Sequence, residues 1–182
     1  FYSLVNLAQN GDNIAYSNKI YGGSQTLLVH VLKRFGIEGR VFDIDNLSTL
    51  EKIIDDKTKA IFFESLSNPQ IAIADVKTIT DIAKKHKIAT ICDNTVATPI
   101  LYRPFDFGVD ISVHSLTKYI NGHGSGLGGA VIEREGLNEL IKDNFRYPAF
   151  NTPDESYHGL IYANLPLPIF SIRIITEWLR NI

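Results

Sequence analysis

The residues whose types and spacing could do chemistry gather in residues 112–129, SVHSLTKYINGHGSGLGG. Lys118 follows a short apolar run there and precedes a glycine-rich stretch. A lysine at the rim of a sheet among small residues is expected to be desolvated, which favours the neutral, nucleophilic amine. Ser115 and Thr117 supply hydroxyls that can hold a phosphate, and the glycines allow close backbone approach. A lone lysine is usually a solvated surface charge, but this combination predicts a site for a phosphorylated carbonyl cofactor.

Two shorter patterns in the same segment are typical of other chemistry. Residues 124–129, GSGLGG, fit the G-x-G-x-x-G pattern of dinucleotide sites, but they precede a predicted strand and do not open a helix. Residues 115–118 fit the S-x-x-K of penicillin-recognising enzymes, but the companion S-D-N and K-T-G motifs are absent. A nicotinamide-dependent oxidoreductase therefore stays only a remote alternative, which extraction of the cofactor would separate.

Three further polar positions are candidates for ligand contacts. Asp93 ends the apolar run ATICD, where a partly buried carboxylate needs a cation or a hydrogen-bond donor, and a lone aspartate there is more often a structural cap or ion pair. Tyr21 begins the turn YGGS and is either an ordinary turn aromatic or a ring that lies flat on a planar cofactor. Asn68 precedes Pro69, which indicates a turn, and its amide could hydrogen-bond a ligand oxygen.

A sheet must bring these separated residues together. Short apolar runs alternate with helical patterns, which predicts βαβ units and a mostly parallel sheet covered on both faces. The predicted strands are 13–17, 40–44, 60–64, 88–92, 111–113 and 130–133, and the predicted helices are 1–10, 24–35, 47–55 and 75–86. Ligands of such sheets bind beyond the carboxyl ends of the strands, which is where the candidate residues fall.

Composition excludes several classes of protein. The chain has 182 residues, 45% of them hydrophobic and 21% charged, the profile of a globular domain. A net charge of −2 offers no basic face for nucleic acid, and no run of about 18 apolar residues could span a membrane. The single cysteine, Cys92, is compatible with a reducing cytoplasm. We therefore expect no nucleic acid, membrane or metal partner, and because the chain starts and stops within helical patterns we expect it to be incomplete.

Four motifs taken together resemble a known family. DISVHSLTKYINGHG, ICDNT, ESLSNP and YGGS are similar, in their order and separation, to motifs of the Cys/Met-metabolism family of pyridoxal 5′-phosphate (PLP) enzymes. The resemblance covers essentially the whole chain and implies the three-layer α/β/α large domain of the aspartate-aminotransferase fold type I. It implies a large domain over 1–165, incomplete at its N-terminus, and at 166–182 the start of a helix that leads to an absent C-terminal domain.

The resemblance also assigns roles to matching positions. Lys118 would form the Schiff base with PLP, and Asp93 would bind the protonated pyridine nitrogen, so that the ring acts as an electron sink. Tyr21 would stack on the ring and take part in proton handling, and Asn68 would hydrogen-bond the phenolic oxygen. The hydroxyls of Ser115 and Thr117 would bind the phosphate. An arginine for the substrate carboxylate and phosphate contacts from a neighbouring subunit would lie outside this sequence.

The segment FNTPDESYHGLIY, residues 150–162, indicates the subgroup. It resembles the insertion region of O-acetylhomoserine sulfhydrylases, with Glu155 where that pattern has proline. Tyr157 and His158 would lie near the acyl-homoserine pocket, or else at a packed helix end. The implied activity is conversion of O-acetylhomoserine and sulfide to homocysteine and acetate, by a cytoplasmic homotetramer with active sites at the dimer interfaces. The alternatives are cystathionine γ-synthase, a cystathionine lyase, methionine γ-lyase, or a non-catalytic relative of the fold.

Overall fold

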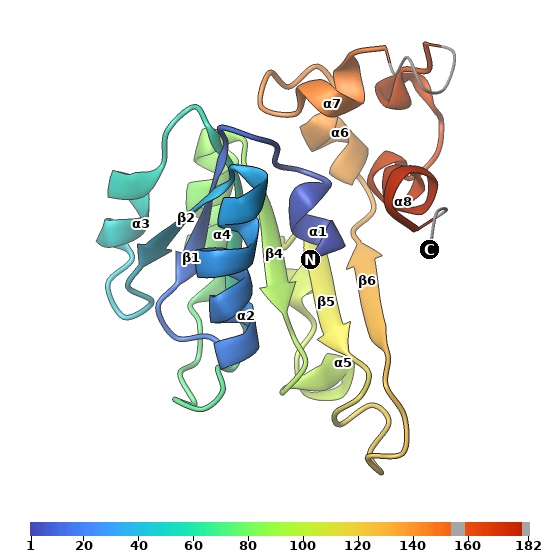
Figure 1. The fold of residues 1–182 in the computed structure, drawn as a ribbon. Helices are drawn as coiled ribbons and strands as arrows, with labels where there is room; N and C mark the ends of the chain where they lie inside the picture. Colours follow the sequence, from blue (N-terminus) through green and yellow to red (C-terminus); the bar gives the residue numbers. More distant parts are fainter. Residues whose placement is uncertain (154–158, 180–182) are drawn as a thin grey trace.

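The computed structural model describes residues 1–153 and 159–179 of the chain. A six-stranded sheet with the order β2-β1-β3-β4-β5-β6 forms its centre (Figure 1). The strands are β1 (Asn13–Ser17), β2 (Glu38–Phe42), β3 (Thr58–Glu64), β4 (Ala89–Asp93), β5 (Ile111–Ser115) and β6 (Gly129–Glu133). All neighbouring pairs are parallel except β5 and β6, which are antiparallel. The predicted mostly parallel sheet is thus confirmed, with strand ends shifted by up to two residues.

Helical segments cover both faces of the sheet, which gives three layers (Figure 1). One face carries α1 (Tyr2–Val5), α2 (Gly22–Thr26), η1 (Leu27–Val31), η2 (Leu32–Phe35), α6 (Leu137–Ile141), α7 (Pro148–Asn151), η5 (Tyr162–Asn164), α8 (Ile169–Arg173) and η6 (Ile174–Leu179). The other carries α3 (Ser48–Ile53), α4 (Val76–His86) and η3 (Pro104–Phe107), while α5 (Thr98–Leu101) follows the carboxyl end of β4. Within the described residues, no helix is long and apolar enough to cross a membrane.

Burial follows the position of each strand in the sheet. Every residue of β1 and β3 is buried, whereas the outer strands β2 and β6 are partly exposed. Alternate residues of β3 enter two separate cores: Phe62 packs with α1 and α8, and Phe63 packs with α4. The continuous apolar runs in the sequence therefore reflect helices packed on both sides of the central strands.

Local interactions set the ends of the helices. Helix α4 is capped by Asp75, whose side chain accepts a hydrogen bond from the backbone N–H of Thr78 (3.1 Å). The helical run from α2 through η2 ends at Gly36, which has φ of 70°. The predicted helix over 1–10 is shorter, ending at Val5. The chain turns away because the backbone N–H of Gln9 bonds to the side chain of Asp12 (2.9 Å), which competes with continuation of the helix.

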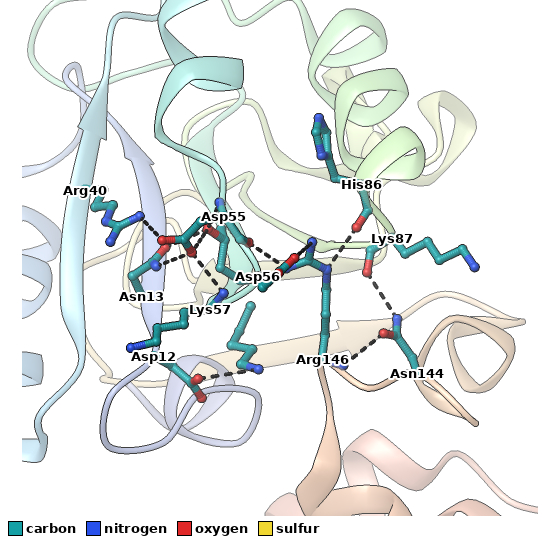
Figure 2. Close-up of polar contacts among 12 residues, drawn as sticks. Asp12, Asn13, Arg40, Asp55, Asp56, Lys57, His86, Lys87, Asn144 and Arg146 are labelled. Atoms are coloured by element: carbon teal, nitrogen blue, oxygen red, sulfur yellow. Dashed lines mark hydrogen bonds and ion pairs between the residues drawn. The ribbon is translucent and has the colours of Figure 1, made fainter.

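A polar network holds the edge of the sheet opposite the carboxyl ends of the parallel strands (Figure 2). Arg146 is 5% exposed, and its guanidinium donates hydrogen bonds to three backbone carbonyls. These belong to His86 (3.0 Å), Asp55 (2.7 Å) and Thr58 (3.0 Å). Because the three carbonyls lie near the start of β3 and the end of α4, Arg146 ties the C-terminal part of the described chain to the sheet.

Asp55 belongs to the same network (Figure 2). Its carboxylate accepts hydrogen bonds from Asn13 (2.8 Å), from Arg40 (2.6 Å) and from the backbone N–H of Lys57 (2.9 Å). Burial raises the pKa of Asp55, but these hydrogen bonds and the charge of Arg40 outweigh burial and bring the pKa to about 2.

Candidate active site

A pocket of about 560 Å³ lies at the carboxyl ends of β3, β4 and β5. Its volume is within the range of about 300–1,000 Å³ that is typical of small-molecule sites. All six residues predicted to contact a cofactor line it: Tyr21, Asn68, Asp93, Ser115, Thr117 and Lys118. The fold therefore brings together residues that are up to 97 positions apart in the sequence.

Adjacent strands place two carboxylates at the rim of the pocket. In the parallel pairing of β3 with β4, Glu64 stands opposite Asp93, so both side chains project from the same face of the sheet. Asp93 is half-buried and accepts a hydrogen bond from the backbone N–H of Thr95 (2.9 Å). The oxygens of Asp93 are thus oriented by the turn that follows β4.

The turn after β5 places the predicted phosphate ligands. The backbone N–H of Ser115 donates to Oγ1 of Thr95 (2.7 Å), which joins the ends of β4 and β5. Thr117 accepts a hydrogen bond from the backbone N–H of Gly128 (3.1 Å), so the start of the turn is fixed to the strand that returns along it. Both hydroxyl-bearing residues therefore sit on a cross-linked part of the pocket wall.

Lys118 lies in this turn, and its backbone carbonyl accepts a hydrogen bond from Gly122 (2.9 Å). The sequence predicted a desolvated amine, but Lys118 is exposed in the structure. The prediction of burial is wrong for the described residues, because Lys118 lies in a turn beyond the carboxyl end of β5, at the rim of the sheet. Lys118 nevertheless lines the pocket.

Tyr21 closes another side of the pocket, and its ring folds back over Gly23. The residue precedes the first turn of α2 and is 53% exposed. A Cβ atom on Gly23 would lie 2.8 Å from Cε1 of Tyr21, closer than two carbons can pack, whereas one on Gly22 would meet nothing within 4 Å. The second glycine of YGGS therefore makes room for the ring.

Asn68 lies in the loop that leaves β3. This loop folds back on itself through a bridge between Leu66 and Ile73 and through a hydrogen bond from Ala72 to the Ser67 hydroxyl (2.9 Å). The peptide bond between Asn68 and Pro69 is cis. The loop places Asn68, which is exposed, in the lining of the pocket.

The glycine-rich stretch lines the pocket without forming a dinucleotide site. Gly122 and Gly124 both border the pocket and have φ values of 73° and 65°, which favour glycine. The G-x-G-x-x-G match ends at Gly129, the first residue of β6, so it opens no helix. The strand–turn–helix arrangement that this motif needs is absent from residues 111–133.

Glu64, which no sequence motif singled out, also lines the pocket. Its side chain is 6% exposed, and one oxygen accepts a hydrogen bond from the backbone N–H of Tyr21 (2.7 Å) and the other from that of Asn68 (3.0 Å). Burial raises the pKa of Glu64, against the lowering effect of the two N–H groups, and the nearby Asp93 raises it further. Its place at the end of an apolar strand, like that of Asp93, is the signal that could have found it.

Tyr157 and His158, predicted near a substrate pocket, lie outside the described residues.

The groups in the pocket suit a phosphorylated pyridine aldehyde. The amine of Lys118 can bind an aldehyde carbon, and the carboxylate of Asp93 can accept a hydrogen bond from a ring N–H. An aromatic face from Tyr21 and hydroxyls from Ser115 and Thr117 complete the set that such a cofactor needs. The residues present therefore fit PLP.

Comparisons with known proteins agree with this set of groups. The sequence profile of the Cys/Met metabolism PLP-dependent enzymes matches residues 1–156. An O-acetyl-L-homoserine sulfhydrylase of Corynebacterium glutamicum is 37% identical over 98% of this chain and 42% of its own length. A cystathionine beta-lyase of Lactococcus lactis is 41% identical over 71% of this chain and 34% of its own length.

A solved structure shares the fold closely. It is a Campylobacter jejuni protein, assigned provisionally as an O-acetylhomoserine (thiol)-lyase, that contains N′-pyridoxyl-lysine-5′-monophosphate. It is 69% identical to this chain, with a TM-score of 0.99 over 100% of this chain and 45% of its own. This chain thus spans less than half of the length of these relatives. With the profile match over most of the sequence, the chain belongs to the Cys/Met metabolism family of PLP-dependent enzymes.

Proposed function

We propose that the whole protein converts O-acetylhomoserine and sulfide to homocysteine and acetate with PLP as its cofactor. The observation that carries the proposal is the meeting of all six predicted cofactor contacts in one pocket. The identity with an O-acetyl-L-homoserine sulfhydrylase along nearly the whole chain supports the choice of substrate. The chain spans 42% of that relative's length, so the activity proposed is that of the whole protein.

Each pocket residue has a distinct task in this proposal. PLP supplies a protonated ring that withdraws electrons from the substrate's Cα. Lys118 holds the cofactor before the substrate binds, and Asp93 keeps the ring nitrogen protonated by accepting its hydrogen bond. Tyr21 covers the ring face, and Asn68 donates a hydrogen bond to the phenolic oxygen. The two hydroxyls after β5 hold the phosphate.

Proton transfer is the main chemical work of the chain's own residues. When the substrate amine takes the place of Lys118 on the cofactor, the freed Lys118 amine can accept a proton from Cα of the substrate. Loss of a second proton, from Cβ, lets acetate leave Cγ, where hydrosulfide adds, and the two protons then return to Cα and Cβ. Acid–base catalysis of this kind contributes about 10²–10⁴-fold to the rate.

The test is an absorbance spectrum of the purified whole protein, followed by addition of O-acetylhomoserine and sulfide. We expect a near-visible band from the lysine-bound cofactor, a change in that band with substrate, and homocysteine and acetate in equal amounts. Lys118→Ala should lose the band and at least about 10²-fold in rate. Lys52→Ala, at an exposed lysine of α3, is the matched control and should keep both. A Lys118→Ala protein that retained the band and the rate would refute the assignment.

A cystathionine lyase is the second candidate, favoured by the identity with the Lactococcus lactis enzyme. The pocket residues named above would serve either enzyme, so only the substrate separates the two functions. Release of a 2-oxo acid and ammonia from cystathionine, with no homocysteine formed from O-acetylhomoserine, would favour the lyase.

We propose further that the protein is a cytoplasmic homotetramer. Among the described residues, large apolar side chains are strongly exposed on segments that border the pocket: Ile100 and Leu101 on α5 (90% and 80%), and Leu127 (93%). A second copy of the chain would cover such side chains. The unpaired, buried Cys92 is compatible with a reducing compartment.

A further inference from the structure

We propose that Glu64 is a positioning residue, whose single carboxylate clamps the two loops that carry Tyr21 and Asn68 into the cofactor pocket. The cofactor part of this inference rests on the proposed function, whereas the clamp itself is a property of the chain alone.

The geometry of the clamp is explicit. Glu64 is the last residue of β3, so its backbone is held in the sheet between β1 and β4. Oε1 accepts the backbone N–H of Tyr21 at 2.7 Å, and Oε2 accepts that of Asn68 at 3.0 Å. One strand end, held in the sheet, therefore contacts the backbones of both loops.

The clamped loops need such support. Tyr21 is 53% exposed and Asn68 is also exposed, so packing holds neither side chain firmly. A carboxylate that accepts backbone N–H groups forms charge-assisted hydrogen bonds, which are about twice as strong as neutral ones. The backbone of each loop is thus fixed at the residue whose side chain faces the pocket.

A carboxylate is the group that this position requires. Both of its oxygens accept a hydrogen bond, and both donors are backbone N–H groups. A glutamine has one acceptor oxygen, and its amide NH₂ would face the other N–H, so one donor would lose its partner. Glu64→Gln therefore keeps the size of the side chain and releases one of the two loops.

Glu64 also stands close to the proposed ligand of the ring nitrogen. It stands opposite Asp93 in the strand register, and neighbouring strands are about 4.8 Å apart. When both carboxyl groups are ionised, they favour a positive charge beside them, such as a protonated ring nitrogen would supply. The same residue would thus position the ring's contacts and favour the charge of the ring.

A matched control exists in Glu133. It ends β6, is half-buried, and accepts a hydrogen bond from the backbone N–H of Ser171 (3.2 Å). Burial raises the pKa of Glu133, as it does for Glu64. Glu133 does not line the pocket. Glu133→Gln therefore repeats the chemical change at a strand end of the same sheet without touching the proposed clamp.

The experiment compares Glu64→Gln with Glu133→Gln in the whole protein. Backbone hydrogen exchange, read by mass spectrometry on peptides that contain Tyr21 or Asn68, reports the clamp with or without cofactor. Equilibrium binding of PLP to the cofactor-free enzyme and the visible circular dichroism of the bound cofactor report how the ring is held. For Glu64→Gln we expect about 10–100-fold faster exchange at one or both loops, and weaker PLP binding with an altered dichroic band.

Exchange at both loops equal to that of Glu133→Gln would overturn the proposal, as would unaltered PLP binding and dichroism. If Glu64→Gln fails to fold, Glu64→Asp supplies the same comparison, because it keeps the charge but is one methylene too short to reach both donors. A wild-type protein that binds no PLP would refute the proposed function, while the exchange rates would still decide on the clamp.

Discussion

Exchange of Gly23 for alanine should move the ring of Tyr21 without disturbing the chain around it. The new Cβ would lie 2.8 Å from Cε1 of the ring and 3.2 Å from Cδ1. Carbon atoms pack at about 3.5–4.0 Å, so the near edge of the ring must retreat by about 0.7 Å or more. Gly22→Ala is the matched control, because its Cβ would meet nothing within 4 Å.

The two substitutions should have similar effects on stability and different effects on the pocket. Both glycines lie in the first turn of α2, and neither has a positive φ, so alanine fits the backbone at each. A stacked aromatic contact is worth about 0.5–1.5 kcal/mol. Losing the contact should weaken PLP binding by up to about tenfold. A shift of about 1 Å in a group that positions the substrate can lower the rate by up to about 10²-fold.

The assay is equilibrium binding of PLP to the cofactor-free whole protein, with steady-state kinetics on O-acetylhomoserine and sulfide. Gly23→Ala should be impaired in both, and Gly22→Ala should resemble the wild type. Equal PLP dissociation constants and rates for the two variants would refute the idea that the ring position over Gly23 matters to the cofactor.

Two further predictions concern the polar network at the opposite edge of the sheet. Arg146→Ala leaves three backbone carbonyls without their charged donor and should lower the free energy of unfolding by about 3 kcal/mol or more, measured by urea denaturation. Arg103→Ala, at a side chain that is 72% exposed, should change the free energy of unfolding by less than about 0.5 kcal/mol. Equal losses of unfolding free energy in the two variants would contradict the role of the buried guanidinium. The pKa of Asp55 is lowered to about 2, so its contribution to stability is complete above the unfolded value near 4 and is lost as the pH falls toward 2. Because this side chain is 42% exposed, Asp55→Asn should lower the free energy of unfolding by about 1 kcal/mol at neutral pH. The variant should also lose less stability than the wild type between pH 4 and 2. Parallel curves of stability against pH for the two proteins would refute this.

Much of the fold could be predicted because the central strands are buried on both faces. β1 and β3 therefore carry apolar runs at their centres, IAY and AIFF, and the helical pattern over 75–86 matches α4 with its cap, Asp75. The edge strand β2 was predicted two residues too late in the chain, because its sequence, EGRVF, begins with three residues that are not apolar and carries a weak strand signal. The helix over 1–10 was predicted too long because the side chain of Asp12 accepts a hydrogen bond from the backbone N–H of Gln9. The spacing of apolar residues does not reveal this contact.

The sequence by itself determined which chemical groups are present and near which strand ends they lie. A lysine preceded by two hydroxyls and an aspartate at the end of a buried strand are readable because each depends on its immediate neighbours. Only the tertiary structure decided which of these groups lie side by side and which form hydrogen bonds. The pairing of β3 with β4 sets Glu64 beside Asp93, and the approach of Tyr21 to Glu64 joins residues 43 positions apart. Such contacts depend on strand register and loop closure, which are properties of the whole sheet and leave no local pattern in the chain.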